Sequence, residues 1–306
     1  MDVVKDFHLD SKISMKDLVS QMGESGGFQV KNVALAVEIL KTMLKKKNCL
    51  RILSFPADII ATGTRGIIKD FVQKKLFDLV VTTCGTLDHD LARSYKNYYH
   101  GDFFADDKDL HKKGVHRLGN IFIPKESYGL IIEEKMKKIL EEIYAEGKKE
   151  LSTYEFCWEM GKRIENENSI LHWCWKNKIP VIVPGITDGA VGYQIWQFSQ
   201  DHDFKINILK DEKLLSDFMW KSKTSGALII GGGISKHHVI WWNQFKDGLD
   251  YAVYITTAVE YDGSLSGART HEAISWGKIK EKAKHVNIEG DATVLLPLIY
   301  TTLLRK

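Results

Sequence analysis

The residues with the clearest capacity for chemistry lie in one stretch of the 306-residue sequence, between Gly231 and Lys278. Three consecutive glycines follow a short apolar run there. This predicts a buried strand that leads into a phosphate-binding turn, because only glycine lets a ligand approach the backbone so closely. A histidine pair, His237 and His238, comes next, and imidazole can move protons near neutral pH. The stretch ends on a lysine close to Trp276, an amine next to an aromatic face.

Each of these pieces also has a plain structural interpretation. The glycines are not the dinucleotide fingerprint, because the last glycine of G-x-G-x-x-G is replaced by Lys236. A histidine pair is often a hydrogen-bonded structural feature or part of a polar rim. A single lysine such as Lys278 is usually a solvated surface charge. Periodicity and glycines alone therefore indicate an α/β dinucleotide-binding protein whose reaction stays open.

A second cluster, Asp88, His89 and Asp90, follows a strongly β-branched run at residues 79–83. Such a cluster could hold a metal ion, act in catalysis or form a solvated loop. We expect no metal ion, because no cysteine or second histidine is in register with it. We interpret it as a ligand-facing loop, since parallel sheets bind their ligands at the carboxyl ends of the strands.

The order of three segments is more specific than any segment alone. GGG-x-x-KHH begins at Gly231, EYDGS-x-SGA begins at Glu260, and EA-x-SWGK ends at Lys278. In this order they resemble deoxyhypusine synthase, and the similarity covers nearly the whole chain from about Leu50. The sequence is most similar to the shorter, archaeal-type members of that family.

The resemblance implies an activity and its partners. Deoxyhypusine synthases use NAD to transfer the aminobutyl group of spermidine to one lysine of the precursor of translation initiation factor five-A, through an imine on an enzyme lysine. We therefore expect NAD as the cofactor, and spermidine or a related polyamine and the initiation factor as substrates. We also expect a cytoplasmic homotetramer with active sites at the dimer interface. Nucleic acid, membranes and metal ions are not expected as partners.

Family roles carry over by motif onto particular residues. Lys278 of SWGK matches the imine-forming lysine, and His237 matches the histidine that handles the proton of the secondary amine. The matches for polyamine binding are Glu272, Trp276, Asp262, Gly263, Ser266, Asp88 and His89. The matches for cofactor binding are Ala57, Asp58, Ala61, Thr83, Cys84, Gly85, Asp188, Gly232, Thr257, Ala258, Asp291 and Ala292. Either Asp188 or Asp291 is expected to accept a hydrogen bond from a ribose hydroxyl.

Several polyamine-contacting positions depart from the better-known eukaryotic pattern. Two acids and an asparagine of that pattern are replaced here by Tyr193, Leu265 and Trp241, and a glutamate pair becomes Asp88 and His89. The resemblance therefore supports the reaction type better than the identity of the amine donor. Two alternatives stay open: a homospermidine-synthase-type transfer to a small diamine, and a catalytically silent regulatory paralogue. Loss of Lys278 would be the signature of the second.

The elements that must position these residues alternate between strands and helices. Strands are predicted at residues 50–55, 79–83, 180–183, 227–230 and 251–256, with a short last strand at 286–288. Between them come helices, such as an amphipathic one over residues 30–46 with Val33, Val37 and Leu40 at helical spacing. Ser14 and Asp17 predict the capped start of a short helix further upstream.

This alternation predicts an α/β fold, a doubly wound, mainly parallel sheet with helices on both faces in a Rossmann-like dinucleotide-binding domain. We expect residues 1–45 to form a small N-terminal helical extension and residues 46–306 to form the NAD-binding catalytic domain.

Composition adds constraints on the partners. The formal charge of +3 is too small to argue for nucleic-acid binding. The four cysteines form no CxxC pair, which argues against a zinc site or redox dithiol and suits a reducing cytosol. Apolar runs fall short of the roughly 20 residues that a membrane-spanning helix needs.

Overall fold

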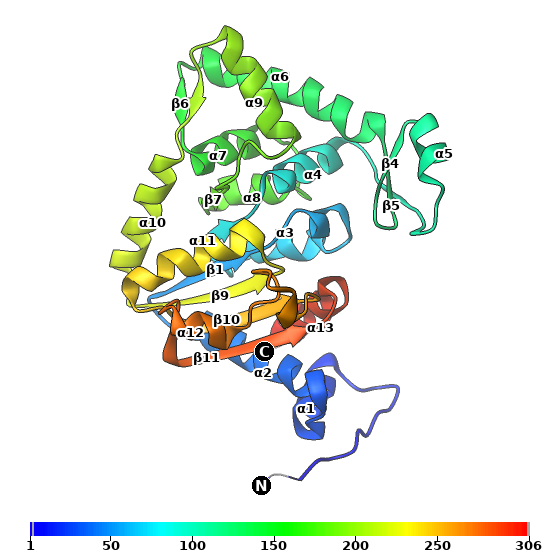
Figure 1. Cartoon of the computed structure of the whole chain (residues 1–306), viewed down its shortest axis with the longest axis vertical. Helices are drawn as coiled ribbons and strands as arrows, with labels where there is room; N and C mark the ends of the chain where they lie inside the picture. The colour runs from blue at the N-terminus through cyan, green and yellow to red at the C-terminus, as the bar shows by residue number, and fades with distance from the viewer. Residues whose placement is uncertain (2, 305–306) are drawn as a thin grey trace. The chain divides into compact units, whose positions relative to one another are not determined.

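The structure, a computed structural model, describes Met1 and residues 3–304, and the chain forms two compact units (Figure 1). The first unit combines Met1–Phe55 with Leu215–Lys306, drawn in blue and in yellow to red. The second unit is Pro56–Leu214, drawn in cyan to yellow-green. These two units differ from the predicted division into residues 1–45 and 46–306. The separate N-terminal extension stays a prediction.

The first unit is built on a parallel sheet. Its strands lie in the order β11-β10-β9-β1, and every neighbouring pair is parallel. The bounds are β1 Cys49–Ser54, β9 Thr224–Ile230, β10 Leu249–Thr256 and β11 Ile279–Glu289. Val253 lies opposite Leu228 on one side and Val286 on the other. The inner strands are buried along most of their length, as expected where helices cover both faces.

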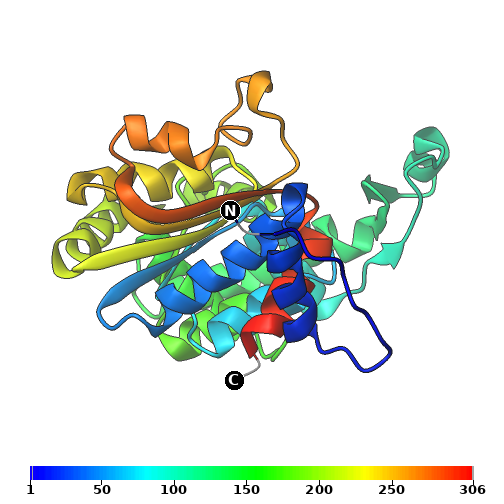
Figure 2. The same ribbon diagram turned by 90° about the horizontal axis from the view of Figure 1, so that it is seen from below.

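Helices cover this sheet on both sides. Figure 2 shows α2 and α13 on one face and α11 and α12 on the other. The bounds are α1 Met15–Ser25, α2 Phe28–Lys45, α11 Gly233–Asn243, α12 Thr270–Ser275 and α13 Ala292–Leu304, with the short 3₁₀ turns η3 Gln244–Lys246 and η4 Glu260–Asp262. The apolar spacing of α2 buries Val33, Val37 and Leu40, as predicted. Ser14 caps α1 by accepting from the Asp17 N–H, also as predicted.

The second unit is mainly helical around a short parallel pair, β2 Leu79–Val81 and β7 Val181–Ile182. Its helices are α3 Arg65–Gln73, α4 Cys84–Tyr95, α6 Gly129–Ala145, α7 Thr153–Arg163, α8 Ile170–Asn177 and α9 Ala190–Asp201, with 3₁₀ turns η1 Asp58–Ala61 and η2 Lys125–Ser127. A second parallel pair joins β6 Glu150–Leu151 to β8 Lys205–Ile206. Helix α10, Leu209–Lys221, contains the boundary between the units.

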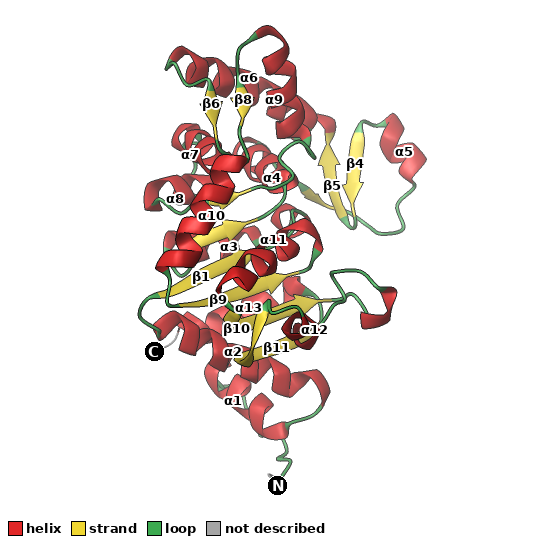
Figure 3. Ribbon diagram, turned by 60° about the vertical axis from the view of Figure 1, so that its left-hand side comes forward, coloured by secondary structure: helices red, strands yellow, loops and turns green. Residues whose placement is uncertain are grey.

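The second unit also contains a small antiparallel sheet that the sequence pattern did not predict. Its strands are β3 Tyr99–His100, β5 Ile121–Pro124 and β4 Val115–Leu118, in the order β3-β5-β4. Helix α5, Asp107–Lys112, precedes β4 and lies beside it (Figure 3). It has no buried residue.

The predicted α/β class, with a mainly parallel sheet and helices on both faces, is confirmed. Two local predictions were wrong. Cys84 to Asp90 is not a loop but the first half of α4. The last strand extends over Ile279–Glu289 instead of residues 286–288, because its polar first half, KEKAK, lies on a partly exposed edge strand and lacks the apolar pattern of a buried one. None of the helices described combines the length and apolar character needed to cross a bilayer.

Candidate active site

The glycine turn joins β9 to α11. Gly231 and Gly233 adopt positive φ angles of 66° and 67°, a region that favours glycine. Gly232 has a different requirement: a Cβ there would lie 2.3 Å from the Cα of Ser266. The segment around Ser266 therefore packs directly on the turn. Because Gly232 has no side chain to cap α11, the first N–H groups of this helix have no side-chain acceptor from that residue.

Lys278 lies between α12 and β11, held by its backbone. Its N–H donates to the Ala273 carbonyl at 2.9 Å, and its carbonyl accepts from the Leu249 N–H at 3.0 Å. The side chain is only 9% exposed, and Nζ lies 5.1 Å from the ring centroid of Trp276. Among the described residues no carboxylate or carbonyl binds this Nζ. It is a nearly buried amine without a hydrogen-bonded partner, in contact with an aromatic face.

His237 lies close enough to Lys278 for the lysine's charge to affect its titration. Burial lowers the pKa of His237, and the positive charge of Lys278 lowers it further. The imidazole is therefore neutral at pH 7 and can accept a proton. One helical turn later on α11, Trp241 lies nearly parallel to this ring, with 5.9 Å between centroids and 20° between planes. Trp241 is 42% exposed, so it is not a core residue.

The remaining polyamine candidates of the first unit lie between β10 and Lys278. Glu272 is exposed on α12. Burial lowers the pKa of Lys236 and raises that of Tyr254, and the negative charge of Glu272 opposes the first shift and adds to the second. Asp262 and Gly263 are exposed, and the Asp262 carboxylate accepts from the Ser264 N–H at 2.7 Å. The structure thus brings His237, Lys278, Trp276 and Glu272 onto the α11–α12 side of the sheet.

Cofactor candidates of the first unit meet at the carboxyl edge of the same sheet. Gly232 follows β9, Thr257 and Ala258 follow β10, and Asp291 and Ala292 follow β11. The Asp291 carboxylate caps α13, accepting from the N–H and the hydroxyl of Thr293 at 2.8 Å each. This edge is the expected position of a ligand site in a parallel sheet.

The backbone of Lys278 lies at the opposite end of β10. Leu249, the first residue of that strand, bonds to the Lys278 carbonyl, and Thr256, the last, bonds to the Gly290 N–H. At about 3.3 Å per residue, the two ends of an eight-residue strand are about 23 Å apart. The backbone of Lys278 and the carboxyl edge are therefore separated along the sheet of one chain.

In the second unit, Asp88 is buried and fully engaged. Its carboxylate accepts from the N–H groups of Ala190 at 2.9 Å and Val191 at 2.7 Å, and from the Tyr128 hydroxyl at 2.8 Å. Burial raises its pKa, while these hydrogen bonds act in the opposite direction. Asp88 is a cap for the N-terminus of α9, and the ligand-facing loop expected at this position is not present.

His89 also turns into the protein. Its Nδ1 lies 2.9 Å from the Tyr98 hydroxyl. Burial, reinforced by the charge of Arg93, lowers its pKa to about 4, so the ring is neutral at pH 7. The third member of the cluster, Asp90, pairs with Arg65 at 2.8 Å in the interior. Among the described residues, no cluster of histidines, cysteines and acids has the arrangement of a metal site.

The cofactor candidates of the second unit lie around the start of α4. A Cβ on Gly85 would lie 2.8 Å from the Cβ of Ala57, so the turn containing η1 packs closely on this helix. Ala61 and Cys84 are buried, whereas Asp58 is exposed. Thr83, the residue before α4, makes no side-chain cap. Asp188 is exposed, and its carboxylate accepts no hydrogen bond from the described residues.

Lys236 is a residue to which sequence reasoning assigned no role. It is 1% exposed, and its Nζ donates to the carbonyls of Leu265 and Ala268 at 2.7 Å each. A signal was available in the sequence, because Lys236 shares one face of α11 with the buried Val239 and Asn243. An interior face that includes a lysine requires an internal partner for the charge.

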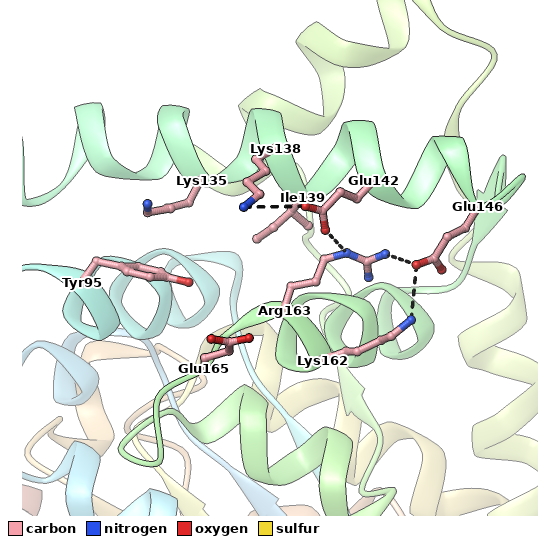
Figure 4. A pocket seen from close by; sticks show the side chains of 9 residues that line it. All are labelled: Tyr95, Lys135, Lys138, Ile139, Glu142, Glu146, Lys162, Arg163 and Glu165. Atoms are coloured by element: carbon pink, nitrogen blue, oxygen red, sulfur yellow. Dashed lines mark hydrogen bonds and ion pairs between the residues drawn. The ribbon is translucent and has the colours of Figure 1, made fainter.

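A cavity of about 420 Å³ in the second unit does not coincide with any predicted site residue (Figure 4). It is lined by Tyr95, Lys135, Lys138, Ile139, Glu142, Glu146, Lys162, Arg163 and Glu165. Arg163 lies between Glu142 and Glu146 and pairs with both, at 2.9 and 2.6 Å. Lys138 and Lys162 also pair with Glu142 and Glu146, so most of the charged groups in this cavity already have partners within the protein.

Comparisons with known proteins agree on one family. The sequence model of that family, deoxyhypusine synthase, matches residues 17–303. A Picrophilus torridus protein named "Probable deoxyhypusine synthase" is 56% identical over 303 residues, which cover 99% of this chain and 97% of the relative. A Thermoplasma acidophilum protein of the same name is 54% identical over 297 residues, covering 97% and 95%.

A solved structure gives the same result for the fold. The crystal structure of a "putative deoxyhypusine synthase from Entamoeba histolytica" aligns with a TM-score of 0.67 at 21% identity. The alignment covers 98% of this chain and 96% of that one. At this identity the similarity shows a shared fold.

Proposed function

This chain belongs to the deoxyhypusine synthase family, and from that premise we propose that it transfers the aminobutyl group of spermidine to one lysine of the precursor of translation initiation factor five-A. NAD is the proposed cofactor, and an imine on Lys278 is the proposed intermediate. The observation that carries the proposal is the environment of Lys278, a nearly buried amine that has no hydrogen-bonded partner among the described residues and has Trp276 and His237 beside it.

The residues present fit a dinucleotide. In the first unit α11 starts without a side-chain cap, and in the second unit so does α4; a helix start of this kind can bind phosphate oxygens through its N–H groups. The turn at Gly232 has no room for a Cβ. The N-terminus of α9 does not fit, because Asp88 already occupies it. NAD bound to such groups would supply one function, taking a hydride from the substrate and returning it to the product.

Of the two acids considered for the ribose, Asp188 is the better candidate. Its carboxylate is exposed and accepts no hydrogen bond from the described residues, whereas that of Asp291 caps α13. Asp88 holds the N–H groups of Ala190 and Val191, which lie two and three residues after Asp188. We therefore propose that Asp88 acts by placing Asp188, and that direct polyamine contact falls mainly to Glu272. The other proposed cofactor contacts are Ala57, Asp58, Ala61, Thr83, Cys84, Gly85, Gly232, Thr257, Ala258 and Ala292.

The proposed role of Lys278 follows from amine chemistry. A neutral amine is a nucleophile and an ammonium is not, so we propose that Nζ attacks after it has lost its proton. Once the carbon next to the secondary amine of spermidine is oxidised, Nζ attacks that carbon and diaminopropane leaves as the free amine. The acceptor lysine then attacks the same carbon and releases Lys278. His237, neutral at pH 7, takes the proton of the secondary amine in the first stage.

The polyamine itself would bind through cation recognition. Glu272 can pair with one terminal ammonium, and the face of Trp276 can bind an alkylammonium group. Asp262, Gly263 and Ser266 belong to the neighbouring segment, and we propose that they border the polyamine site. His89 is neutral and bonded to Tyr98, so we propose that it contributes shape, and not charge, to polyamine binding.

We also propose a homotetramer with active sites completed at a dimer interface. The distance of about 23 Å between the Lys278 backbone and the carboxyl edge of the sheet supports a second copy as donor of part of each site. Exposed tryptophans in the first unit, Trp241 and Trp220, support an interface as well. We place the reaction in the cytoplasm, since all four cysteines are free and buried, as in proteins of reducing compartments.

The decisive test is mass spectrometry of the initiation factor precursor after incubation with this protein, NAD and spermidine. The expected result is the gain of one aminobutyl group on a single lysine. A parallel reaction with putrescine in place of the initiation factor tests transfer to a small diamine, and product in that reaction alone would reject the protein acceptor.

Borohydride reduction after addition of spermidine and NAD is expected to attach the amine to Lys278. The variant Lys278→Arg should lose both the adduct and turnover, while Lys282→Arg, an exposed lysine of β11, should keep them. Unchanged turnover in Lys278→Arg would contradict the proposal.

A further inference from the structure

Two lysines lie near the proposed catalytic centre, and their surroundings differ. Lys278 has no hydrogen-bonded partner among the described residues, whereas Lys236 has two. The ammonium of Lys236 also lies 4.3 Å from the ring centroid of Tyr254, a contact that stabilises a cation over an aromatic face. Lys236 is thus fully engaged and, at 1% exposure, out of reach of a substrate.

The two carbonyls that Lys236 binds belong to one short segment. Leu265 and Ala268 enclose Ser266, the residue that packs on Gly232. This segment ends the long connection from β10 to α12, which also contains η4 and exposed side chains such as Tyr261. Directly after it, Arg269 binds the Glu289 carboxylate, so the segment is held at Lys236 and again at the end of β11.

The position of this segment determines where the polyamine candidates lie. Ala268 is two residues before α12, the helix that carries Glu272 and leads to Lys278. Lys236 itself lies on α11, one residue before His237. The buried ammonium of Lys236 therefore connects α11, which carries His237, with the segment that leads into α12. Lys278 follows α12 in the chain.

Retaining a charge there has an energetic cost. Burial lowers the pKa of Lys236 to about 8, a shift that the negative charge of Glu272 opposes and the positive charge of Arg269 increases. Two carbonyl acceptors and an aromatic face compensate for the lost hydration. An apolar residue of similar length would fill the same space without this cost, so packing alone does not explain a lysine.

We propose that Lys236 is a positioning residue that fixes the segment Leu265–Ala268 on α11 and so places Glu272 and Lys278 relative to His237. This inference rests on the proposed function for its kinetic consequence, but its structural part is independent of any activity. It does not make Lys236 a catalytic residue, because its Nζ is enclosed by protein groups.

The test compares Lys236→Met with wild type and with the control Lys246→Met. Methionine keeps the length and apolar stem of lysine but donates no hydrogen bond. Lys246 is a suitable control, because its Nζ also donates to a chain carbonyl, that of Ser222 at 2.7 Å, elsewhere in the first unit. Amide hydrogen exchange of the peptide spanning residues 257–269 is measured for all three proteins.

Exchange in that peptide should accelerate at least about tenfold in Lys236→Met, as expected for the loss of hydrogen bonds worth about 1 kcal/mol each. It should not change in Lys246→Met. Equal exchange in both variants would overturn the inference. If Lys236→Met does not fold, Lys236→Gln replaces it: the shorter side chain cannot reach both carbonyls, and exchange at least about threefold faster is expected. Unchanged exchange in that variant overturns the inference as well.

Kinetics test the functional consequence. In Lys236→Met the spermidine KM should rise and kcat/KM should fall by about 10²-fold, the effect of a misplacement of roughly 1 Å, while Lys246→Met stays close to wild type. A merely structural role would lower the melting temperature and leave the KM of the folded enzyme unchanged, which would contradict positioning. If wild type itself did not react with spermidine and NAD, the proposed function would fail, and hydrogen exchange alone would decide the role of Lys236.

Discussion

The substitution Gly232→Ala tests the close packing between the glycine turn and the segment around Ser266. The added methyl group would lie 2.3 Å from the Cα of Ser266 and 2.2 Å from its Oγ. An ordinary separation needs about 3.4 Å, so the segment must move by roughly 1.1 Å, and the obstacle includes backbone. The φ angle of Gly232 is −155°, outside the positive region that favours glycine, so the clash with Ser266 is the effect that this variant tests.

Overpacking of this kind costs about 1–3 kcal/mol of unfolding free energy. The functional effect should be larger, because a shift of roughly 1 Å in a segment leading to Glu272 and Lys278 is expected to reduce kcat/KM by about 10²-fold. Denaturant unfolding measures the first quantity, and the rate of aminobutyl transfer to the initiation factor precursor at several spermidine concentrations measures the second. Gly27→Ala is the control, since a Cβ there meets no atom within 4 Å and φ is −84°.

A double variant separates the backbone obstacle from the side-chain obstacle. Adding Ser266→Gly to Gly232→Ala removes the Cβ and Oγ of residue 266, but its backbone α-carbon still lies 2.3 Å from the new methyl group, so recovery should be incomplete. Full recovery would show that the backbone is not the obstacle. Wild-type stability and kinetics in Gly232→Ala would refute the close packing on which the reasoning depends.

Three further predictions concern buried charges. Asp90→Ala should cost about 3–5 kcal/mol in denaturant unfolding, because it leaves the buried guanidinium of Arg65 without its carboxylate. Burial raises the pKa of Asp211 to about 6, so the folded state binds its proton more tightly than the unfolded state, and this residue's contribution to stability falls as pH rises from about 4 to 6. Unfolding free energies measured from pH 4 to 7 should show this fall, up to about 3 kcal/mol, in wild type relative to Asp211→Asn. Lys278→Met should raise the pKa of His237, followed by NMR titration of the imidazole, because the charge of Lys278 lowers it.

Each of these predictions has a matched control within the chain. Asp109→Ala removes an exposed ion pair to Lys113 and should cost no more than about 1 kcal/mol. The pKa of His285 is lowered by burial and by His271, not by Lys278, so it should not move in Lys278→Met. A common shift of both histidines would point to a general change in the fold. A pH dependence of unfolding that is the same in wild type and Asp211→Asn would contradict the assignment to Asp211.

Local features of the fold could be predicted because their causes are local. Ser14 accepts from an N–H three residues away, and the buried face of α2 repeats every three or four residues. The glycine turn at Gly231 is likewise specified by its own backbone angles. Prediction failed where such local signals are missing. Helix α4 has no side-chain cap to mark its start. The first half of β11 lies on a partly exposed edge and lacks the apolar pattern of a buried strand.

Interactions distant in sequence explain the rest. Asp88 was expected to face a ligand, but its partners Tyr128 and Val191 come 40 and 103 residues later in the chain. No local pattern indicates a carboxylate that caps a helix so far away. The cluster Asp88, His89 and Asp90 was therefore interpreted by its polarity, whereas its burial depends on the packing of α4 against other helices of the second unit.

The sequence by itself determined the family, the order of the motifs and the residue types available for chemistry. It could not distinguish the surroundings of Lys236 from those of Lys278, since both are lysines within the same set of motifs and have equal intrinsic pKa values. Only the tertiary structure decided that one amine is bound by carbonyls 29 and 32 residues away and that the other has no such partner among the described residues. The physical reason is that hydration and hydrogen bonding of an amine depend on which distant backbone surrounds it, and folding alone supplies that backbone.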